Sequence, residues 1–102
     1  MSVISVTDET FSSEVEEEAG VVFVDFWAEW CGPCKSLAPH YEQMSTQYPA
    51  KFTKANLSEA EDVAKGLGIR SIPTIIAFRG GTEVARHIGS QLVEDFIATH
   101  AK

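Results

Sequence analysis

The most apolar stretch of the chain is Val21–Trp27, in which Asp25 is the single charged residue. An unbroken run of β-branched and aromatic residues is typical of a central strand that is covered on both faces. Shorter runs bounded by turn-forming residues predict four further strands, at residues 3–6, 52–57, 74–78 and 84–88.

Helical spacing of apolar residues fills the segments between these strands. The first predicted helix carries Phe11 and Val15 on one face, is capped by Thr7 or Asp8 and ends at Gly20. A second begins at Cys34 and contains a proline that is expected to kink it, a third is short and ends at a glycine, and a fourth follows the last strand. Their apolar positions are Leu37, Ala38, Tyr41, Met44 and Tyr48, then Val63, Ala64 and Leu67, then Leu92, Val93, Phe96 and Ile97.

The order of these elements predicts an α/β fold. Strands and helices alternate at first, which implies right-handed parallel crossovers. The Gly80-Gly81 pair between the last two strands indicates a tight hairpin, and therefore an antiparallel edge. We expect a central mixed five-stranded sheet with four helices on both faces, in a single domain that spans residues 1–102.

Charge narrows the classes of function. The formal net charge is −7, and the eight Lys and Arg residues are scattered, which argues against nucleic-acid binding. The acidic first segment lacks the pattern of a signal peptide, and Asp25 interrupts the longest apolar run, so no membrane span is expected. These observations predict a cytoplasmic monomer.

The candidate chemistry lies in two cysteines, Cys31 and Cys34, where the buried strand ends and a helix begins. Unpaired N–H groups and the helix dipole at that end favour a thiolate, so the pKa of Cys31 is expected below the free value of about 8.5. Three residues apart on a helix, the cysteines lie within disulfide range. We expect Cys31 to be the exposed attacking thiol and Cys34 the inner, resolving one.

Two other roles for the pair remain open. A structural disulfide that closes so short a loop would stabilise the fold by only about 2 kcal/mol. A zinc site would need two further ligands, and the candidates are His40, His87 and His100, which have no paired spacing.

Three segments make the chain similar to a known family. They are the run VDFWAEWCGPCK at residues 24–35, the run GIRSIPT at residues 68–74, and Gly89. In order and over essentially the whole chain, they resemble the thioredoxin family. The resemblance implies the thioredoxin fold and a cis Ile72-Pro73 peptide bond beside the cysteines.

The resemblance also implies supporting residues. A buried Asp25 is expected to have a raised pKa and to exchange a proton with Cys34, with Lys54 close by. A flat docking face for unfolded protein segments is implied, made of Trp30, Gly32, Pro33, Ile72, Pro73 and Gly89. The alternatives are that Asp25 bonds a nearby backbone group or faces a solvent-exposed edge, that Lys54 is an exposed strand lysine, and that Trp30 and Ile72 pack in the ordinary way.

The resulting prediction is an electron carrier that reduces protein disulfides and is itself reduced by a thioredoxin reductase, with no bound cofactor and no metal. A redox-sensing binding module and a net oxidant or isomerase are the alternatives. The Gly-Pro pair between the cysteines favours a reductant, by family resemblance.

Overall fold

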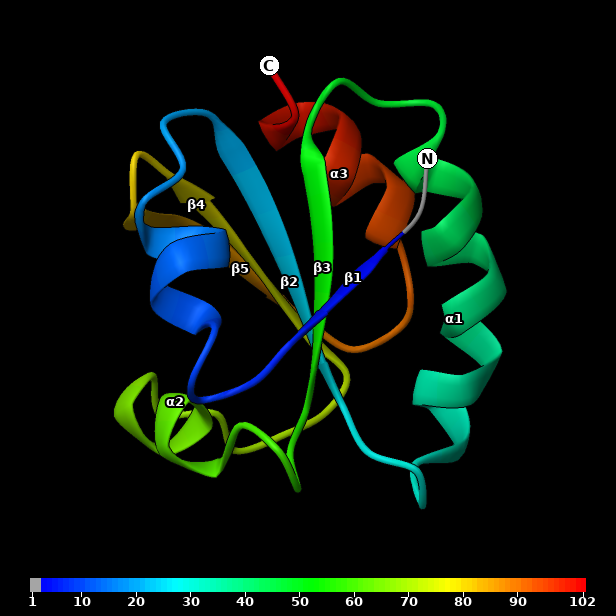
Figure 1. The fold of residues 1–102 in the computed structure, drawn as a ribbon. Coiled ribbons are helices and arrows are strands. Elements are labelled where there is room, and N and C mark those ends of the chain that lie inside the picture. The colour runs from blue at the N-terminus through cyan, green and yellow to red at the C-terminus, as the bar shows by residue number, and fades with distance from the viewer. Residues whose placement is uncertain (1–2) are drawn as a thin grey trace.

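A computed structural model describes residues 3–102, and a five-stranded sheet runs through its middle (Figure 1). The strands are β1 (Ile4–Val6), β2 (Val21–Trp27), β3 (Lys51–Asn56), β4 (Thr74–Arg79) and β5 (Thr82–Ile88). The helices are η1 (Ser12–Glu16), α1 (Gly32–Ser45), α2 (Glu61–Gly66) and α3 (Val93–His100). The predicted element order is confirmed.

The strands lie in the order β1-β3-β2-β4-β5. The first three are mutually parallel, while β4 runs antiparallel to β2 and β5 antiparallel to β4. The predicted mixed sheet is therefore confirmed, and its antiparallel part includes β4 as well as the edge strand. β2 lies at the centre, with all residues from Val21 to Phe26 buried.

The helices form a layer on each face of the sheet, with η1 and α2 on one side and α1 and α3 on the other (Figure 1). Alternate side chains of β2 therefore pack into two separate cores, one around Val22, Val24 and Phe26 and the other around Phe23. Two aromatic residues from the predicted apolar strand and helix, Trp27 and Phe96, are only partly buried.

The first helix differs from its prediction. Its main-chain bond from Glu17 N–H to the Ser12 carbonyl spans five residues, which makes η1 a wide, π-type turn rather than an α-helix. No side chain among the described residues, 3–102, caps it. Asp8 instead accepts hydrogen bonds from the backbone N–H groups of Val63 and Asp62, at 2.9 and 3.3 Å, and so caps α2.

Two turns decide how the last elements meet. Gly80 and Gly81 have φ angles of 60° and 81° and join Arg79 to its pairing partner Thr82, which confirms the predicted hairpin. Leu92, predicted on the apolar face of the last helix, instead precedes α3 with a φ of 61° and is 72% exposed.

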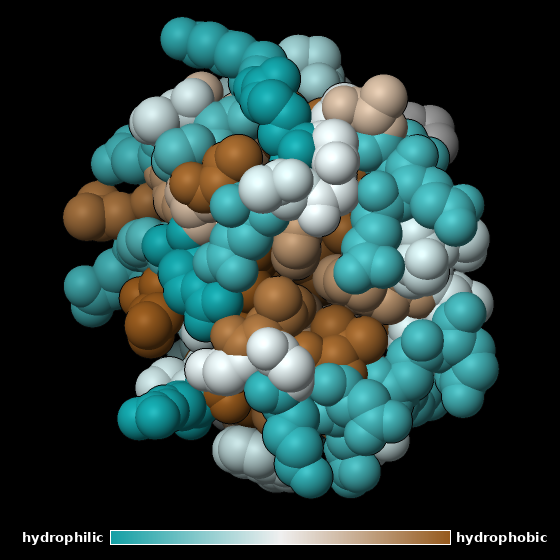
Figure 2. Space-filling view, turned by 90° about the vertical axis from the view of Figure 1, so that its left-hand side faces the viewer, coloured by the Kyte–Doolittle hydropathy of each residue, from teal (hydrophilic) through white to brown (hydrophobic). Residues whose placement is uncertain are grey.

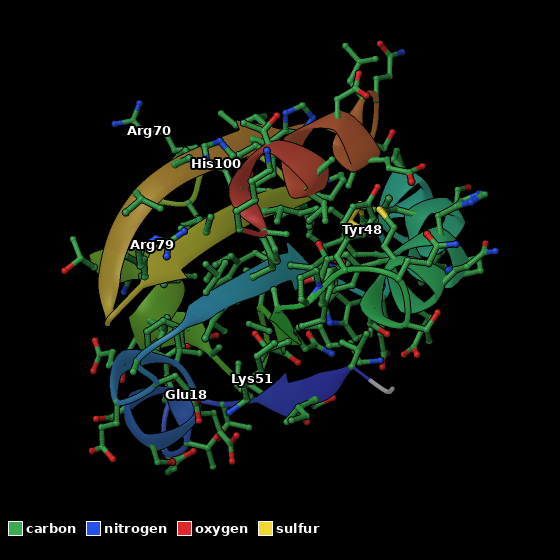
Figure 3. The ribbon with its side chains drawn as sticks, turned by 90° about the horizontal axis from the view of Figure 1, so that it is seen from above. Glu18, Tyr48, Lys51, Arg70, Arg79 and His100 are labelled. Atoms are coloured by element: carbon green, nitrogen blue, oxygen red, sulfur yellow. A yellow bond between two sulfur atoms is a disulfide. The ribbon has the colours of Figure 1, made fainter. Side chains whose placement is uncertain are left out.

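An ion-pair cluster ties β3 to η1 (Figure 3). The Lys51 ammonium lies 2.8 Å from the Glu14 carboxylate and 3.3 Å from that of Glu18, and it also donates to the Glu14 backbone carbonyl. No helix of residues 3–102 is both long and apolar enough to cross a membrane.

Candidate functional site

The two cysteines form a disulfide where β2 gives way to α1, with their Cα atoms 5.3 Å apart. The carboxyl end of a central strand is where ligand and reaction sites lie in open α/β sheets. The turn that links the end of β2 to α1 is held by a hydrogen bond from the Cys31 N–H to the Ala28 carbonyl, at 3.1 Å. The predicted pairing geometry is confirmed.

The N-terminus of α1 provides the Cys31 sulfur with a hydrogen-bond donor. Cys31 occupies the N-cap position, and its Sγ accepts a hydrogen bond from the Cys34 N–H at 3.2 Å. Pro33 stands in the first turn, where its missing N–H leaves no hydrogen bond unmade. A thiolate at Cys31 is therefore stabilised by the N–H and by the positive end of the helix dipole.

The exposure of the cysteines differs from the prediction. Cys31 is 5% exposed and Cys34 is 2% exposed, so in the disulfide form both residues are buried. The order of exposure agrees with Cys31 as the outer sulfur, but Cys31 is not an exposed residue. Its sulfur is covered because Ala28 and the partly buried Trp27, Leu57 and Ile72 pack around the pair.

One side of the disulfide is formed by the loop before β4. The Ile72-Pro73 peptide bond is cis, as predicted, and the Ile72 carbonyl oxygen lies 3.9 Å from Cys31 Sγ. The Gly89 N–H donates to the Pro73 carbonyl at 2.8 Å, which holds the end of β5 against this loop.

The expected docking residues are only partly brought together. A hollow of about 290 Å³ is lined by Pro33, Ile72, Pro73, Ile88, Gly89, Ser90 and Gln91. Trp30 and Gly32 do not line it, and Trp30 is 79% exposed on a neighbouring hollow. The sequence did not single out Ile88, an apolar side chain at this hollow that is 63% exposed.

Asp25 lies beneath the disulfide in a buried position. It is 4% exposed, and its Oδ1 atom has no hydrogen-bond partner among residues 3–102. Burial raises the pKa of Asp25 from 3.8 to about 7, against the opposing effect of the Lys54 charge. A carboxyl with this pKa exchanges protons readily near neutral pH.

A cavity of about 80 Å³ connects Asp25 with the inner cysteine. It lies between α1 and strands β2 and β3, and its walls include Asp25, Cys34 and Lys54, together with Val3, Trp27, Lys35, Ala38, Tyr41 and Glu42. Lys54 pairs with Asp25 across the two strands, and its ammonium lies 5.7 Å from the centre of the Trp27 ring. The structure thus brings Cys34, Asp25 and Lys54 to one cavity.

Tyr41 is a cavity residue that the sequence analysis treated only as part of a helical apolar face. Its spacing of seven residues from Cys34 places the two side chains on the same face of α1. That spacing, combined with a hydroxyl group on a buried face, was the signal that could have identified it.

The three histidines do not form a site with the cysteines. The rings of His87 and His100 pack against Phe96, at 5.4 and 4.8 Å between centres, and His40 is exposed. Across residues 3–102, no three His, Cys, Asp or Glu side chains are grouped so that they could hold a metal ion.

A further hollow, larger than the cavity beside Asp25, lies on the face of η1 and α2, where Figure 2 shows apolar residues gathered between polar ones. It is lined by Phe11, Val63, Leu67 and Phe78, with Glu16, Asp62, Gly66, Gly81 and Glu83. It contains no cysteine, and no predicted site residue lines it.

Comparisons with known proteins agree with this geometry. The chain is 46% identical over 87 residues to thioredoxin 1 of Nostoc sp., covering 83% of this chain and 81% of that protein. It is 46% identical over 93 residues to thioredoxin 1 of Synechococcus elongatus, covering 88% and 87%. It is 39% identical over 90 residues to a Pseudomonas aeruginosa thioredoxin, covering 86% and 83%.

A solved structure and a family model extend the match to nearly every residue. The crystal structure of a Malassezia sympodialis thioredoxin superposes with a TM-score of 0.89 and 31% sequence identity, covering 99% of this chain and 92% of that one. The sequence model of the thioredoxin family matches residues 2–102.

Proposed function

The chain belongs to the thioredoxin family and is a thiol–disulfide oxidoreductase that reduces protein disulfides, and we propose that Cys31 is its nucleophile and Cys34 its resolving thiol. The observation that carries the proposal is the position of Cys31 Sγ, which accepts the Cys34 N–H at the N-terminus of α1. This stabilisation favours the thiolate of Cys31 near neutral pH, which makes Cys31 the better attacking group toward a substrate disulfide.

The proposed reaction proceeds by two exchanges. The Cys31 thiolate attacks one sulfur of a protein disulfide, forming a mixed disulfide and releasing the other substrate sulfur as a thiolate. Cys34 then loses its proton and attacks Cys31 Sγ, which releases the second substrate thiolate. Two electrons pass to the substrate, and the Cys31–Cys34 disulfide seen here is the oxidised product.

The proposed role of Asp25 is to take the proton from Cys34 during the second exchange. Its carboxyl lies in the cavity that Cys34 also lines, and its pKa of about 7 leaves it partly ionised near neutral pH. Lys54, the strand partner of Asp25, favours the ionised form of the carboxyl. We assign both residues to proton handling rather than to substrate contact.

The proposed docking surface combines Trp30, Gly32 and Pro33 with Ile72, Pro73 and Gly89. Its exposed indole and the hollow beside the cis-proline suit an extended peptide segment next to a disulfide. The backbone of Ile72 is available to pair with that segment because proline offers no N–H of its own.

Electrons for the next cycle are proposed to come from a thioredoxin reductase, since a reductase in general reduces the disulfide of family members back to the dithiol. A single-domain monomer in the cytoplasm, with no bound cofactor and no nucleic-acid partner, remains the prediction from the sequence.

Reduction of insulin by dithiothreitol, with and without this protein, tests the proposed function. We expect strong acceleration by the wild-type protein, and none by either the Cys31→Ser or the Cys34→Ser variant. Wild-type protein that failed to accelerate the reaction would contradict the proposal. Full biological activity of both variants would favour a redox-sensing binding module instead.

The proton-handling role has a separate test. Asp25→Ala is expected to slow the resolving step above neutral pH, because the ionised carboxylate that accepts the Cys34 proton is lost. Stopped-flow measurement of mixed-disulfide decay between pH 6 and 9 measures this step. A pH–rate profile identical to that of the wild-type protein would count against the role.

A further inference from the structure

Tyr41 lines the cavity that holds Asp25 and Cys34, and its hydroxyl has no role in the mechanism above. Tyr41 is 2% exposed, and it lines the same cavity as Asp25, Cys34 and Lys54. A buried hydroxyl is costly unless it is hydrogen-bonded, and a phenylalanine ring could fill the same space. The presence of a tyrosine therefore calls for a physical reason.

The hydrogen of the Tyr41 hydroxyl already takes part in a hydrogen bond. Tyr41 donates to the backbone carbonyl oxygen of Thr53, on β3, at 2.8 Å. The ring is held independently by Phe52, with 5.2 Å between ring centres. A hydroxyl has one hydrogen to donate and two lone pairs that accept, so the Tyr41 oxygen is left as an acceptor only.

The Asp25 carboxyl is the complementary group. Its Oδ1 has no hydrogen-bond partner among residues 3–102, and in the protonated state the carboxyl needs an acceptor for its hydrogen. A water needs roughly 10–15 Å³ of cavity volume and at least two polar partners. The cavity of about 80 Å³ provides that volume, and Asp25 and Tyr41 both line it.

We propose that Tyr41 is a positioning residue for the reaction, whose hydroxyl oxygen accepts, through one cavity water, the hydrogen bond that the protonated Asp25 carboxyl donates. The two groups also interact electrostatically: burial first, and then the charge of Asp25, raises the pKa of Tyr41. The proposal deepens the role of Asp25 given above and depends on that role only for its effect on turnover.

The expected sign follows from the direction of the hydrogen bond. The hydrogen of the Tyr41 hydroxyl is directed at Thr53, so the oxygen offers only lone pairs, whose negative charge density favours the neutral carboxyl over the carboxylate. Removal of the hydroxyl therefore lowers the pKa of Asp25. The other groups that face Asp25 are the same in both proteins: Lys54 from β3, Lys35 and Glu42 from α1, the apolar Val3 from the segment before β1, and Ile75 opposite it on β4.

Tyr41→Phe tests the proposal in the oxidised protein, where the two cysteines do not titrate. The pKa of Asp25 is followed by the ¹³C shift of its carboxyl carbon. We expect a decrease of about 0.5–1 unit, the size of one net hydrogen bond. The control is Tyr48→Phe, which removes an exposed hydroxyl that donates to Glu94 and does not line the cavity, and which is expected to leave the value unchanged.

An unchanged or increased pKa of Asp25 in Tyr41→Phe would overturn the proposal. An increase would mean that the hydroxyl acts as a polar group that stabilises the buried carboxylate of Asp25. This measurement does not involve turnover, so it fails or succeeds independently of the proposed proton transfer to Asp25.

Unfolding free energies provide a second readout that a merely structural hydroxyl would not move. If the hydroxyl only bonds Thr53, Tyr41→Phe lowers the free energy of unfolding by the same amount at pH 4 and at pH 8.5. A hydroxyl coupled to protonated Asp25 makes Tyr41→Phe more destabilising at pH 4, and this pH dependence vanishes in an Asp25→Asn background. A pH-independent cost in the native background contradicts the proposal.

Discussion

At the scale of single residues, the Asp25 carboxyl sets the balance between stability and reactivity. It occupies the middle of the most buried strand and has no hydrogen-bond partner for Oδ1 among residues 3–102. Its neutral form is tolerated there, whereas burial penalises its ionised form because the hydration of a free carboxylate is lost. The reaction benefits from a carboxyl that titrates near pH 7, and the fold is less stable because of it.

Asp25→Asn is expected to stabilise the oxidised protein at high pH. The folded-state pKa of about 7 exceeds the unfolded value of 3.8, so the folded protein holds a proton that the unfolded chain releases. Native stability is therefore lost as the pH rises from about 4 to about 7, and the loss reaches about 4 kcal/mol. The Asn variant lacks this loss.

Urea unfolding at pH 3.5, 5.5 and 8.5 measures the effect. The gap between variant and wild type should be near zero at the lowest pH and largest at the highest. Glu29→Gln, at an exposed turn, is the control and should run parallel to wild type. A gap that is constant over this range would show that the carboxyl is not buried as described.

At the scale of elements, a residue far away in the sequence caps the short helix α2, which has no capping side chain of its own. α2 has only six residues, and its own N-cap residue, Ala60, supplies no side-chain hydrogen bond. Asp8, which is 54 residues away from Asp62 in sequence, bonds two N–H groups of its first turn. The negative charge also suits the positive end of the helix.

Asp8→Ala is expected to destabilise the protein by about 1 kcal/mol, the usual cost of a lost N-cap. Chemical unfolding measures the loss, and hydrogen exchange of the amides of Asp62 and Val63 locates it in α2. The neighbouring Glu9→Ala, at an exposed position, is the matched control and should change stability little. Equal effects of the two substitutions would contradict the capping role.

The contact between the β4–β5 hairpin and η1 gives a second prediction at this scale. Gly81 has a φ of 81°, and a Cβ atom there would collide with the backbone carbonyl oxygen of Glu16. Gly81→Ala is therefore expected to cost more than the roughly 1–3 kcal/mol of backbone strain alone. Gly80→Ala, with a φ of 60° and no close contact, isolates the strain.

Gly20→Ala completes this series, since its Cβ would meet nothing within 4 Å. Thermal unfolding should rank the variants as Gly20, Gly80 and Gly81 in increasing order of destabilisation. Gly81→Ala with no greater effect than Gly80→Ala would mean that the hairpin does not press on η1.

At the scale of the whole molecule, the sequence predicted the layers well and the long-range contacts poorly. Continuous apolarity identified β2 as the central strand, and Gly80-Gly81 identified the hairpin, because both signals are local. The capping partner of Asp8 depends on which segments meet in space, so helix-start propensity assigned it to the wrong helix. Leu92 followed the apolar period but lies outside α3, because its backbone is left-handed and it precedes the first helical residue.

The candidate site divides in the same way. The spacing of the two cysteines and their place at a strand end were legible from the residues, and the cis proline and Lys54 came from family resemblance. The burial of Cys31 and the place of Tyr41 in the cavity lining could not be predicted, because each depends on side chains contributed by several elements.

The central claim is that the two cysteines are unequal, and trapping the mixed disulfide tests it most directly. Each Cys→Ser variant, in reduced form, is mixed with an excess of a disulfide-containing protein, and the adducts are counted by mass spectrometry. The account predicts that Cys34→Ser forms a stable adduct through Cys31, while Cys31→Ser forms almost none. Equal adducts on both variants, or an adduct only through Cys34, would contradict it.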